Sequence, residues 1–80
     1  MSMNERLYKI DQMLSERKYT SFDEMMSRLE VSRATLKRDL AYMRDRLNAP
    51  IIFDRGQGGY RFDKTSSHLQ YDLPGLSFPR

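Results

Sequence analysis

The amino-acid sequence predicts a small α+β fold in which three helices are followed by a two-stranded β-hairpin. Three amphipathic segments precede Pro50, and two short apolar segments flank the glycine-rich run 56–59 that comes after it. A chain of 80 residues holds at most one domain with a modest core. We therefore expect a compact fold built mainly from local contacts.

The first helix is expected from Asn4 to about Arg17. Leu7, Ile10 and Leu14 recur there at the spacing of one helix face. Most of the charged residues of this segment are expected to lie off that stripe, namely Glu5, Lys9, Asp11 and Glu16. Residues 18–20 are interpreted as a connector.

The second helix is expected from Phe22 to about Leu29. Ser21 and Glu24 have the spacing of a capping box, in which the serine oxygen and the glutamate three residues later close the helix start reciprocally. The apolar residues then follow at i, i+3, i+4 and i+7, namely Phe22, Met25, Met26 and Leu29.

The third helix is expected over residues 32–47. Glu30-Val31 is interpreted as a tight turn, and Ser32 as the residue that caps the helix. The apolar residues that lie within about 60° of one another on a helical wheel are Leu36, Leu40, Met43 and Leu47. The run 48–50 is expected to end the helix, because the residue before a proline avoids the α region and the ring cannot continue the hydrogen-bond ladder.

The hairpin is expected over residues 51–62. Its turn, Gly56-Gln57-Gly58-Gly59, supplies residues that tolerate positive φ. We assign residues 1–63 to this domain. Residues 64–80 are polar without a period and then punctuated by proline, so we interpret them as an extended C-terminal linker.

Two short helices joined at Glu30-Val31 form a helix-turn-helix pattern, and the hairpin that follows makes it a winged helix-turn-helix. In such a domain one helix enters the major groove of duplex DNA and the hairpin lies against the backbone beside it. Residues 32–46 carry a local charge of +3, whereas residues 20–31 carry −2. The positive charge is concentrated on the candidate recognition helix, as expected for a surface that faces phosphates.

Several residues of the third helix are candidates for reading DNA. The Ser32 cap leaves first-turn N–H groups facing outward, which suits a phosphate. Arg33 and Arg38 have the length to reach guanine O6 and N7 with a bidentate fork, or a phosphate in another pose. Ala34 lets the helix approach base edges and meet a thymine methyl group.

Other candidates are better placed for backbone phosphates, which position a protein without reading sequence: Thr35, Lys37 and Tyr42. In the hairpin, Arg55 and Arg61 bracket the turn, Gln57 at its tip is a candidate for the minor groove, and Arg61 is the one expected to fold back across the hairpin. The complete set of candidate DNA-binding residues is Ser21, Ser32, Arg33, Ala34, Thr35, Lys37, Arg38, Tyr42, Arg55, Gln57 and Gly58.

The segments 31–40 and 50–62 resemble the N-terminal winged helix of DeoR-like, WYL-domain transcriptional regulators, and the resemblance covers about Arg6 to Phe62. Residues 71–76 look like the linker that leads into the next part of such proteins. The resemblance implies groove-reading positions at Ser32, Arg33, Ala34, Thr35, Lys37 and Arg38, with wing contacts near residues 55–58. Family members often carry a polar or basic residue where Ala34 stands, so base readout there is expected to be weaker or limited to a methyl contact. The effector-binding WYL domain of such regulators has no counterpart in this sequence. We expect either an N-terminal fragment or the product of a truncated gene, and we favour a fragment whose homodimerisation would use a C-terminal region.

Other chemistry finds little support. Cysteine is absent, which excludes disulfide and thiolate–metal scaffolds. The single histidine, His68, lies in the expected linker without Cys, Asp or Glu at ligand spacing, so we expect no metal, no cofactor and no enzymatic activity. No apolar run approaches the roughly 20 residues that span a membrane, and the first five residues do not resemble a secretory signal. The expected location is the cytoplasm, in association with the nucleoid.

Two further binding functions remain open. A winged helix used for protein–protein contact would expose apolar residues and few cations on its third helix, whereas the face around Ala34 and Arg38 is basic with small residues. A winged helix that binds RNA would place stacking aromatic residues near the start of this helix, where only Tyr42 is nearby.

Overall fold

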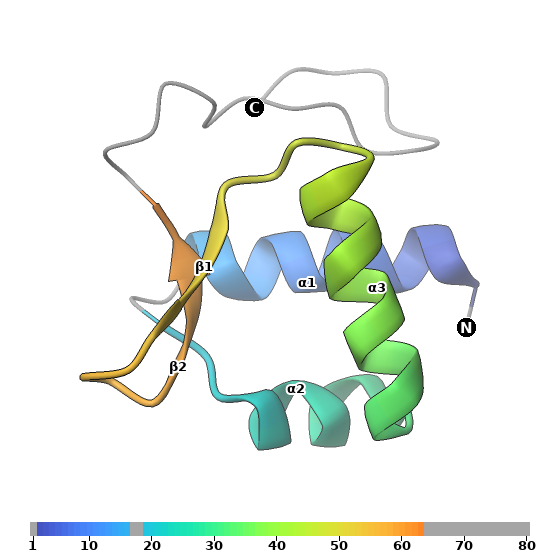
Figure 1. Ribbon diagram of the computed structural model, residues 1–80. Helices are drawn as coiled ribbons and strands as arrows, with labels where there is room; N and C mark the ends of the chain where they lie inside the picture. Colours follow the sequence, from blue (N-terminus) through green and yellow to red (C-terminus); the bar gives the residue numbers. More distant parts are fainter. Residues whose placement is uncertain (1, 17–18, 64–80) are drawn as a thin grey trace.

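The computed structural model describes residues 2–16 and 19–63. Three helices, α1 (Met3–Glu16), α2 (Phe22–Leu29) and α3 (Arg33–Asp45), precede an antiparallel hairpin of β1 (Ile51–Asp54) and β2 (Gly59–Phe62) (Figure 1). This order confirms the winged helix-turn-helix predicted from the sequence. The expected linker 64–80, with His68, lies outside the described residues.

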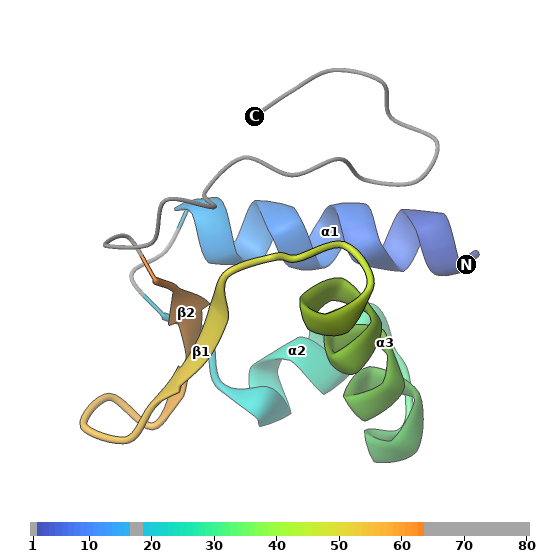
Figure 2. The same cartoon turned by 45° about the horizontal axis from the view of Figure 1, so that its top comes forward.

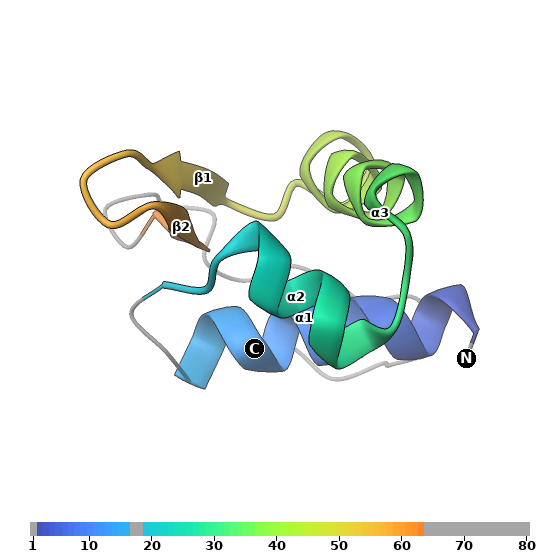
Figure 3. The same ribbon diagram turned by 90° about the horizontal axis from the view of Figure 1, so that it is seen from below.

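α3 and the hairpin, or wing, lie side by side in one layer of the molecule. Seen from below, α1 forms the opposite layer and α2 lies between the two (Figure 3). After a 45° turn from Figure 1, α1 crosses above the wing and α3 (Figure 2). The core between these elements consists of Leu7, Ile10, Met13, Leu14, Met25, Leu29, Leu36, Leu40, Met43, Ala49 and Ile51. Since the core occupies the inner side of α3, the opposite side of this helix faces solvent next to the wing.

Both helices of the helix-turn-helix begin at a serine cap. The Ser21 side-chain oxygen accepts the Glu24 N–H at 3.1 Å, and the Ser32 oxygen accepts the Thr35 N–H at 3.2 Å. Each bond satisfies a backbone donor that has no partner within its helix, which fixes where the helix starts. The tight turn between the helices is confirmed, because Glu30 adopts a left-handed conformation with φ of 55°.

α3 ends earlier than expected and for a different reason. It was expected to reach residue 47 and to stop at the proline, but it ends at Asp45. Asn48 takes a left-handed conformation with φ of 60°, and the Ala49 N–H donates to the Met43 carbonyl oxygen at 2.9 Å. Asparagine tolerates this conformation because its short polar side chain bonds locally, so the helix is already closed before Pro50.

Thr20, expected to lie in a connector, pairs with the wing. Its N–H donates to the Tyr60 carbonyl oxygen and its carbonyl accepts the Tyr60 N–H, both at 2.8 Å. The approach is so close that a Cβ on Gly59 would lie 2.9 Å from the Thr20 carbonyl oxygen. Gly59, expected in the turn, is the first residue of β2. The turn glycine with a positive φ is Gly58, at 74°. This pairing anchors the base of the wing to the helical layer.

The expectation that Asp11 lies off the apolar stripe of α1 is wrong. Its side chain is fully buried, since positions 7, 11 and 14 are one turn apart on the same face of α1. Asp39 of α3 is also buried and lies against Arg6 of α1: Nε to Oδ2 is 2.6 Å and Nη2 to Oδ1 is 3.2 Å. This hydrogen-bonded ion pair raises the pKa of Arg6 above its ordinary value. The Arg6–Asp39 ion pair thus joins α3 to α1, so the role of Asp39 is structural.

Candidate nucleic-acid interface

The N-terminal half of α3 presents most of the predicted DNA-binding side chains to solvent. Ser32, Arg33, Ala34, Lys37 and Arg38 are exposed. They remain outside the core because Leu36, Leu40 and Met43 direct one face of the helix inward. The first turn of α3 is thus free to approach a ligand.

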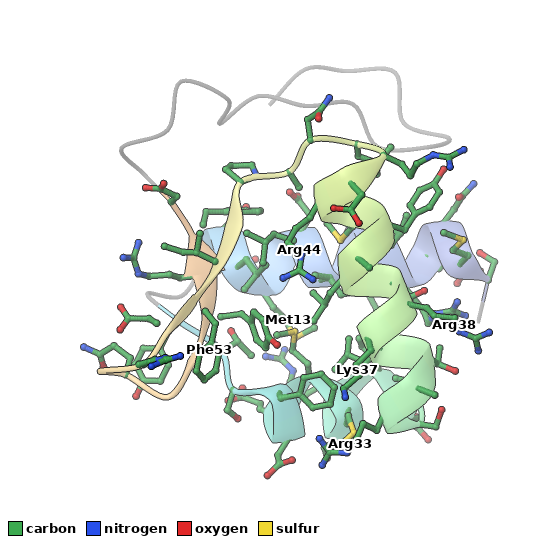
Figure 4. All side chains as sticks on the ribbon, in the orientation of Figure 1. Met13, Arg33, Lys37, Arg38, Arg44 and Phe53 are labelled. Atoms are coloured by element: carbon green, nitrogen blue, oxygen red, sulfur yellow. The ribbon has the colours of Figure 1, made fainter. Side chains whose placement is uncertain are left out.

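The cations of α3 lie on two edges of the helix, with three in a row along one edge and Arg38 alone on the other. Arg33, Lys37 and Arg44 fall within about 40° of one another at 100° per residue. Figure 4 places these three on the edge that faces the wing and Arg38 on the other edge. Arg33 and Arg38, both expected to reach base edges, are therefore separated across the helix. On the same helical wheel, Ala34 lies between this row and Arg38, where its small side chain leaves the helix backbone accessible.

Arg33 has a defined position before any ligand binds. Its guanidinium carbon lies 5.1 Å from the centre of the Phe22 ring, and Phe22 belongs to the first turn of α2. A cation over an aromatic face is attracted by the ring quadrupole, typically by about 0.5–1 kcal/mol at exposed sites. This contact restricts the guanidinium to the wing-facing edge while leaving its N–H donors available.

Four of the predicted phosphate-contacting or capping residues take part in the structure itself. The Ser32 hydroxyl donates to Thr35 Oγ1 at 3.1 Å, so the Thr35 hydroxyl proton stays available for an acceptor such as a phosphate oxygen. Tyr42 is half-buried and packs against the core. Ser21 is half-buried at the start of α2, where its oxygen serves as a helix cap.

The tip of the wing is exposed from Arg55 to Gly58. Asp54 shapes this turn, because its carboxylate accepts the Gln57 N–H at 3.2 Å and Arg61 Nε at 2.9 Å. The Arg61 hydrogen bond, followed by that of the Gln57 backbone, lowers the pKa of Asp54. Arg61 therefore folds back across the hairpin, as expected, whereas Arg55 and Gln57 project from the tip.

The basic residues divide into two groups by their partners. Arg6, Arg28 and Arg61 form ion pairs with Asp39, Glu24 and Asp54, respectively. Among residues 2–16 and 19–63, no ion pair involves the cations of α3, which are Arg33, Lys37, Arg38 and Arg44, nor Arg46 directly after this helix, Arg55 at the wing tip or Lys9 on α1. Apart from Lys9, the unpaired positive charge of the described residues thus lies on α3, directly after it and at the wing tip.

Sequence reasoning missed two residues of this surface. It did not include Arg44 among the candidate DNA-binding residues, although the spacing from Lys37 already places both on one edge of the helix. It also overlooked Phe53 of β1, whose side chain is 50% exposed. No signal in the sequence reveals this exposure, because Phe53 lies two residues after the buried Ile51, on the same face of β1, as a core residue would.

Other kinds of site are not formed by the described residues. Within residues 2–16 and 19–63, no three His, Cys, Asp or Glu side chains gather as metal ligands would. In the same part of the chain, none of the helices has the length and apolar character needed to cross a membrane. A half-open pocket of about 180 Å³ lies between α1 and α2, lined by Lys9, Gln12, Met13, Arg28 and Leu29. None of these lining residues belongs to α3 or to the wing.

Comparison with known proteins gave one finding. A family model described as an HTH domain matches residues 6–61, which include all three helices except the first residues of α1 and nearly the whole wing. No curated protein and no solved structure is significantly similar to the chain.

Proposed function

The chain belongs to the HTH domain family, and we propose that it binds duplex DNA in a sequence-dependent manner as the DNA-reading module of a transcriptional regulator. The observation that carries this proposal is the distribution of unpaired cations. Apart from Lys9 on α1, those of the described residues occur on α3, directly after it and at the wing tip, and α3 and the wing lie in one layer of the molecule (Figure 3). A duplex laid along this layer meets both elements at once, as in winged-helix docking.

In the proposed complex the N-terminal half of α3 enters the major groove. Ala34 allows the helix backbone to approach the base edges, and Arg33 and Arg38 reach outward from opposite edges of the helix toward guanines. Phosphate contacts come from the Ser32 helix start and from Thr35, Lys37 and Tyr42. Phosphates fix the position of the domain on the duplex, while the arginines supply discrimination between bases.

The wing supplies a second contact. Arg55 lies at its exposed tip without a carboxylate partner in the described part of the chain, so its charge is available to a phosphate. Gln57 and Gly58 follow at the same tip, where a polar side chain and an open backbone suit the minor groove. Arg61 is held by Asp54 and acts on the shape of the wing rather than on DNA.

The wider role is proposed from the same function. A module of this kind acts on chromosomal DNA, so we place it in the cytoplasm with the nucleoid. The resemblance to DeoR-like, WYL-domain regulators favours control of transcription, with homodimerisation through a region outside residues 1–63. A dimer predicts a palindromic binding site, because the symmetry of the half-sites mirrors that of the protein.

The proposal is tested by selecting bound sequences from a random duplex pool and measuring affinity for the selected and for a scrambled duplex by fluorescence anisotropy. Salt titrations then examine the wing. Arg55→Ala should lower the slope of log affinity against log salt by about 1 and weaken both duplexes by similar factors.

Lys9→Ala is the matched control. It removes the charge of an exposed residue of α1, which lies in the layer opposite α3 and the wing, and it should leave the salt slope unchanged. No enrichment of any sequence, with equal weak binding to all duplexes, would contradict sequence-dependent reading. Absence of any DNA binding by the folded protein would favour the protein–protein alternative.

A further inference from the structure

Phe53 is the most exposed large apolar side chain among the described residues. Half of its surface is accessible, against 36–40% for Met3, Tyr8 and Tyr19. Its position in the fold does not require this exposure, since it shares a face of β1 with the buried Ile51. A phenyl ring left in water on a small domain calls for an explanation in terms of a ligand.

The Phe53 ring is held in place by a row of aromatic contacts. It lies directly across the hairpin from Tyr60, with ring centres 5.2 Å apart in an edge-to-face arrangement. Tyr60 in turn lies 6.2 Å from Phe22, the residue whose ring carries the Arg33 guanidinium. These contacts connect the wing to the start of α3 and restrict the orientation of Phe53 before any ligand binds.

The edge of α3 that faces the wing carries Arg33, Lys37 and Arg44, and in Figure 4 Phe53 lies on the wing side of these cations. None of the three is in an ion pair with another described residue. An exposed ring and a row of unpaired cations thus border the same region, between α3 and the wing.

We propose that one strand of the DNA backbone runs through this region, with its phosphates on Lys37 and Arg44 and a deoxyribose against the ring of Phe53. This inference rests on the proposed function and extends it to two residues outside the predicted site. When α3 lies in the major groove, the strand that borders the groove on the wing side passes beside this edge of the helix. Phosphates match the cations, and the C–H surface of a sugar matches the phenyl ring.

Charge favours a nucleic acid over a protein in this position. A protein surface that covered Phe53 would have to supply carboxylates for three neighbouring cations, and interface cores are depleted of charged residues. A sugar–phosphate strand alternates anionic phosphates with sugars that have C–H surface. The phosphates complement cations such as Arg44, and the sugars complement the ring of Phe53. The contact involves no base and therefore adds affinity without specificity.

The chain has no tryptophan, so Phe53→Trp introduces a single fluorescent reporter on an otherwise unchanged aromatic position. On addition of a saturating duplex, its emission should shift to the blue and become protected from acrylamide quenching. Tyr8→Trp is the control, because Tyr8 is an exposed aromatic residue of α1. Its emission and quenching should not change.

Two substitutions then separate the apolar from the ionic contact. Phe53→Ala should weaken binding to selected and scrambled duplexes by about tenfold, because roughly half a phenyl side chain no longer leaves water on binding. The salt slope should not change. Arg44→Gln should lower the salt slope by about 1. Thermal unfolding of each variant verifies that the wing and core remain intact. If Phe53→Ala destabilises the wing, the Phe53→Trp variant still tests the contact, because it keeps an aromatic ring at this position.

An unshifted, fully quenchable Phe53→Trp signal in a complex that anisotropy shows to be saturated would overturn the inference while leaving DNA binding intact. An unchanged salt slope for Arg44→Gln would do the same for the ionic part. Failure of the wild-type protein to bind any duplex would instead refute the proposed function, and the inference with it.

Discussion

Replacing Asp39 with alanine should destabilise the fold by about 3 kcal/mol without altering the DNA-binding surface. The carboxylate makes two hydrogen bonds to the Arg6 guanidinium, at 2.6 and 3.2 Å, and its side chain is 4% exposed. Breaking a buried ion pair by removing one partner typically costs about 3–5 kcal/mol. Since the Arg6 side chain is 18% exposed, water can hydrate part of the orphaned guanidinium, which favours the lower end of that range.

The measurement is thermal and urea unfolding followed by circular dichroism. For a domain of this size a loss of about 3 kcal/mol lowers the melting temperature by roughly 12–24 °C. Asp45→Ala is the matched control, because Asp45 is an exposed carboxylate on the same helix and its loss should change stability by no more than about 0.5 kcal/mol. A loss below about 1 kcal/mol for Asp39→Ala would refute the reasoning, since it would place the pair among solvent-screened surface bridges.

DNA binding separates this structural role from a direct one. Asp39 is buried on the inner side of α3, so the affinity of Asp39→Ala for a selected duplex should equal that of wild type at a temperature where both are folded. A weaker affinity in the fully folded variant would mean that the Arg6–Asp39 pair sets the position of α3 on the duplex as well as its attachment to α1.

Three further predictions concern the recognition helix and the wing. Arg38→Ala should weaken binding to the selected duplex by about 1–3 kcal/mol and leave thermal unfolding unchanged; an unaltered affinity would remove Arg38 from the site. Gly59→Ala should cost about 1–3 kcal/mol in urea unfolding, because its new methyl group would lie 2.9 Å from the Thr20 carbonyl oxygen and separate Thr20 from β2; a neutral substitution would show that this close approach relaxes freely. The hydrogen bond from Arg61 lowers the pKa of Asp54, so the stability that this group contributes to the wing is complete above its ordinary value of 3.8 and is lost as the pH falls through the lowered value. The protection of the wing-turn amides against hydrogen exchange, relative to the intrinsic exchange rate at each pH, should therefore fall in acid, and Asp54→Asn should abolish that pH dependence of the protection.

The order and type of the elements could be predicted from the amino-acid sequence, because the signals for them are local. Ser21 and Ser32 fix two helix starts through bonds to N–H groups three residues away. The spacing of Leu36 and Leu40 fixes which side of α3 is buried, and hence that Lys37 and Arg38 are exposed. Even the return of Arg61 across the hairpin was foreseen, since it depends on residues of one short segment.

Contacts between residues that are far apart in the chain could not be predicted and became apparent only in the folded protein. The partner of Asp39 is 33 positions away, and Thr20 pairs with Tyr60 across 40 positions. Neither contact leaves a periodic trace in the sequence. The wing lies beside one particular edge of α3 because the core and the Thr20 pairing hold it there. That placement brings Arg44 and Phe53 to the border of the same region. Sequence periodicity could not predict it, because a repeat of 3.6 or 2 residues specifies which side of a helix or strand is buried but not which element that side faces.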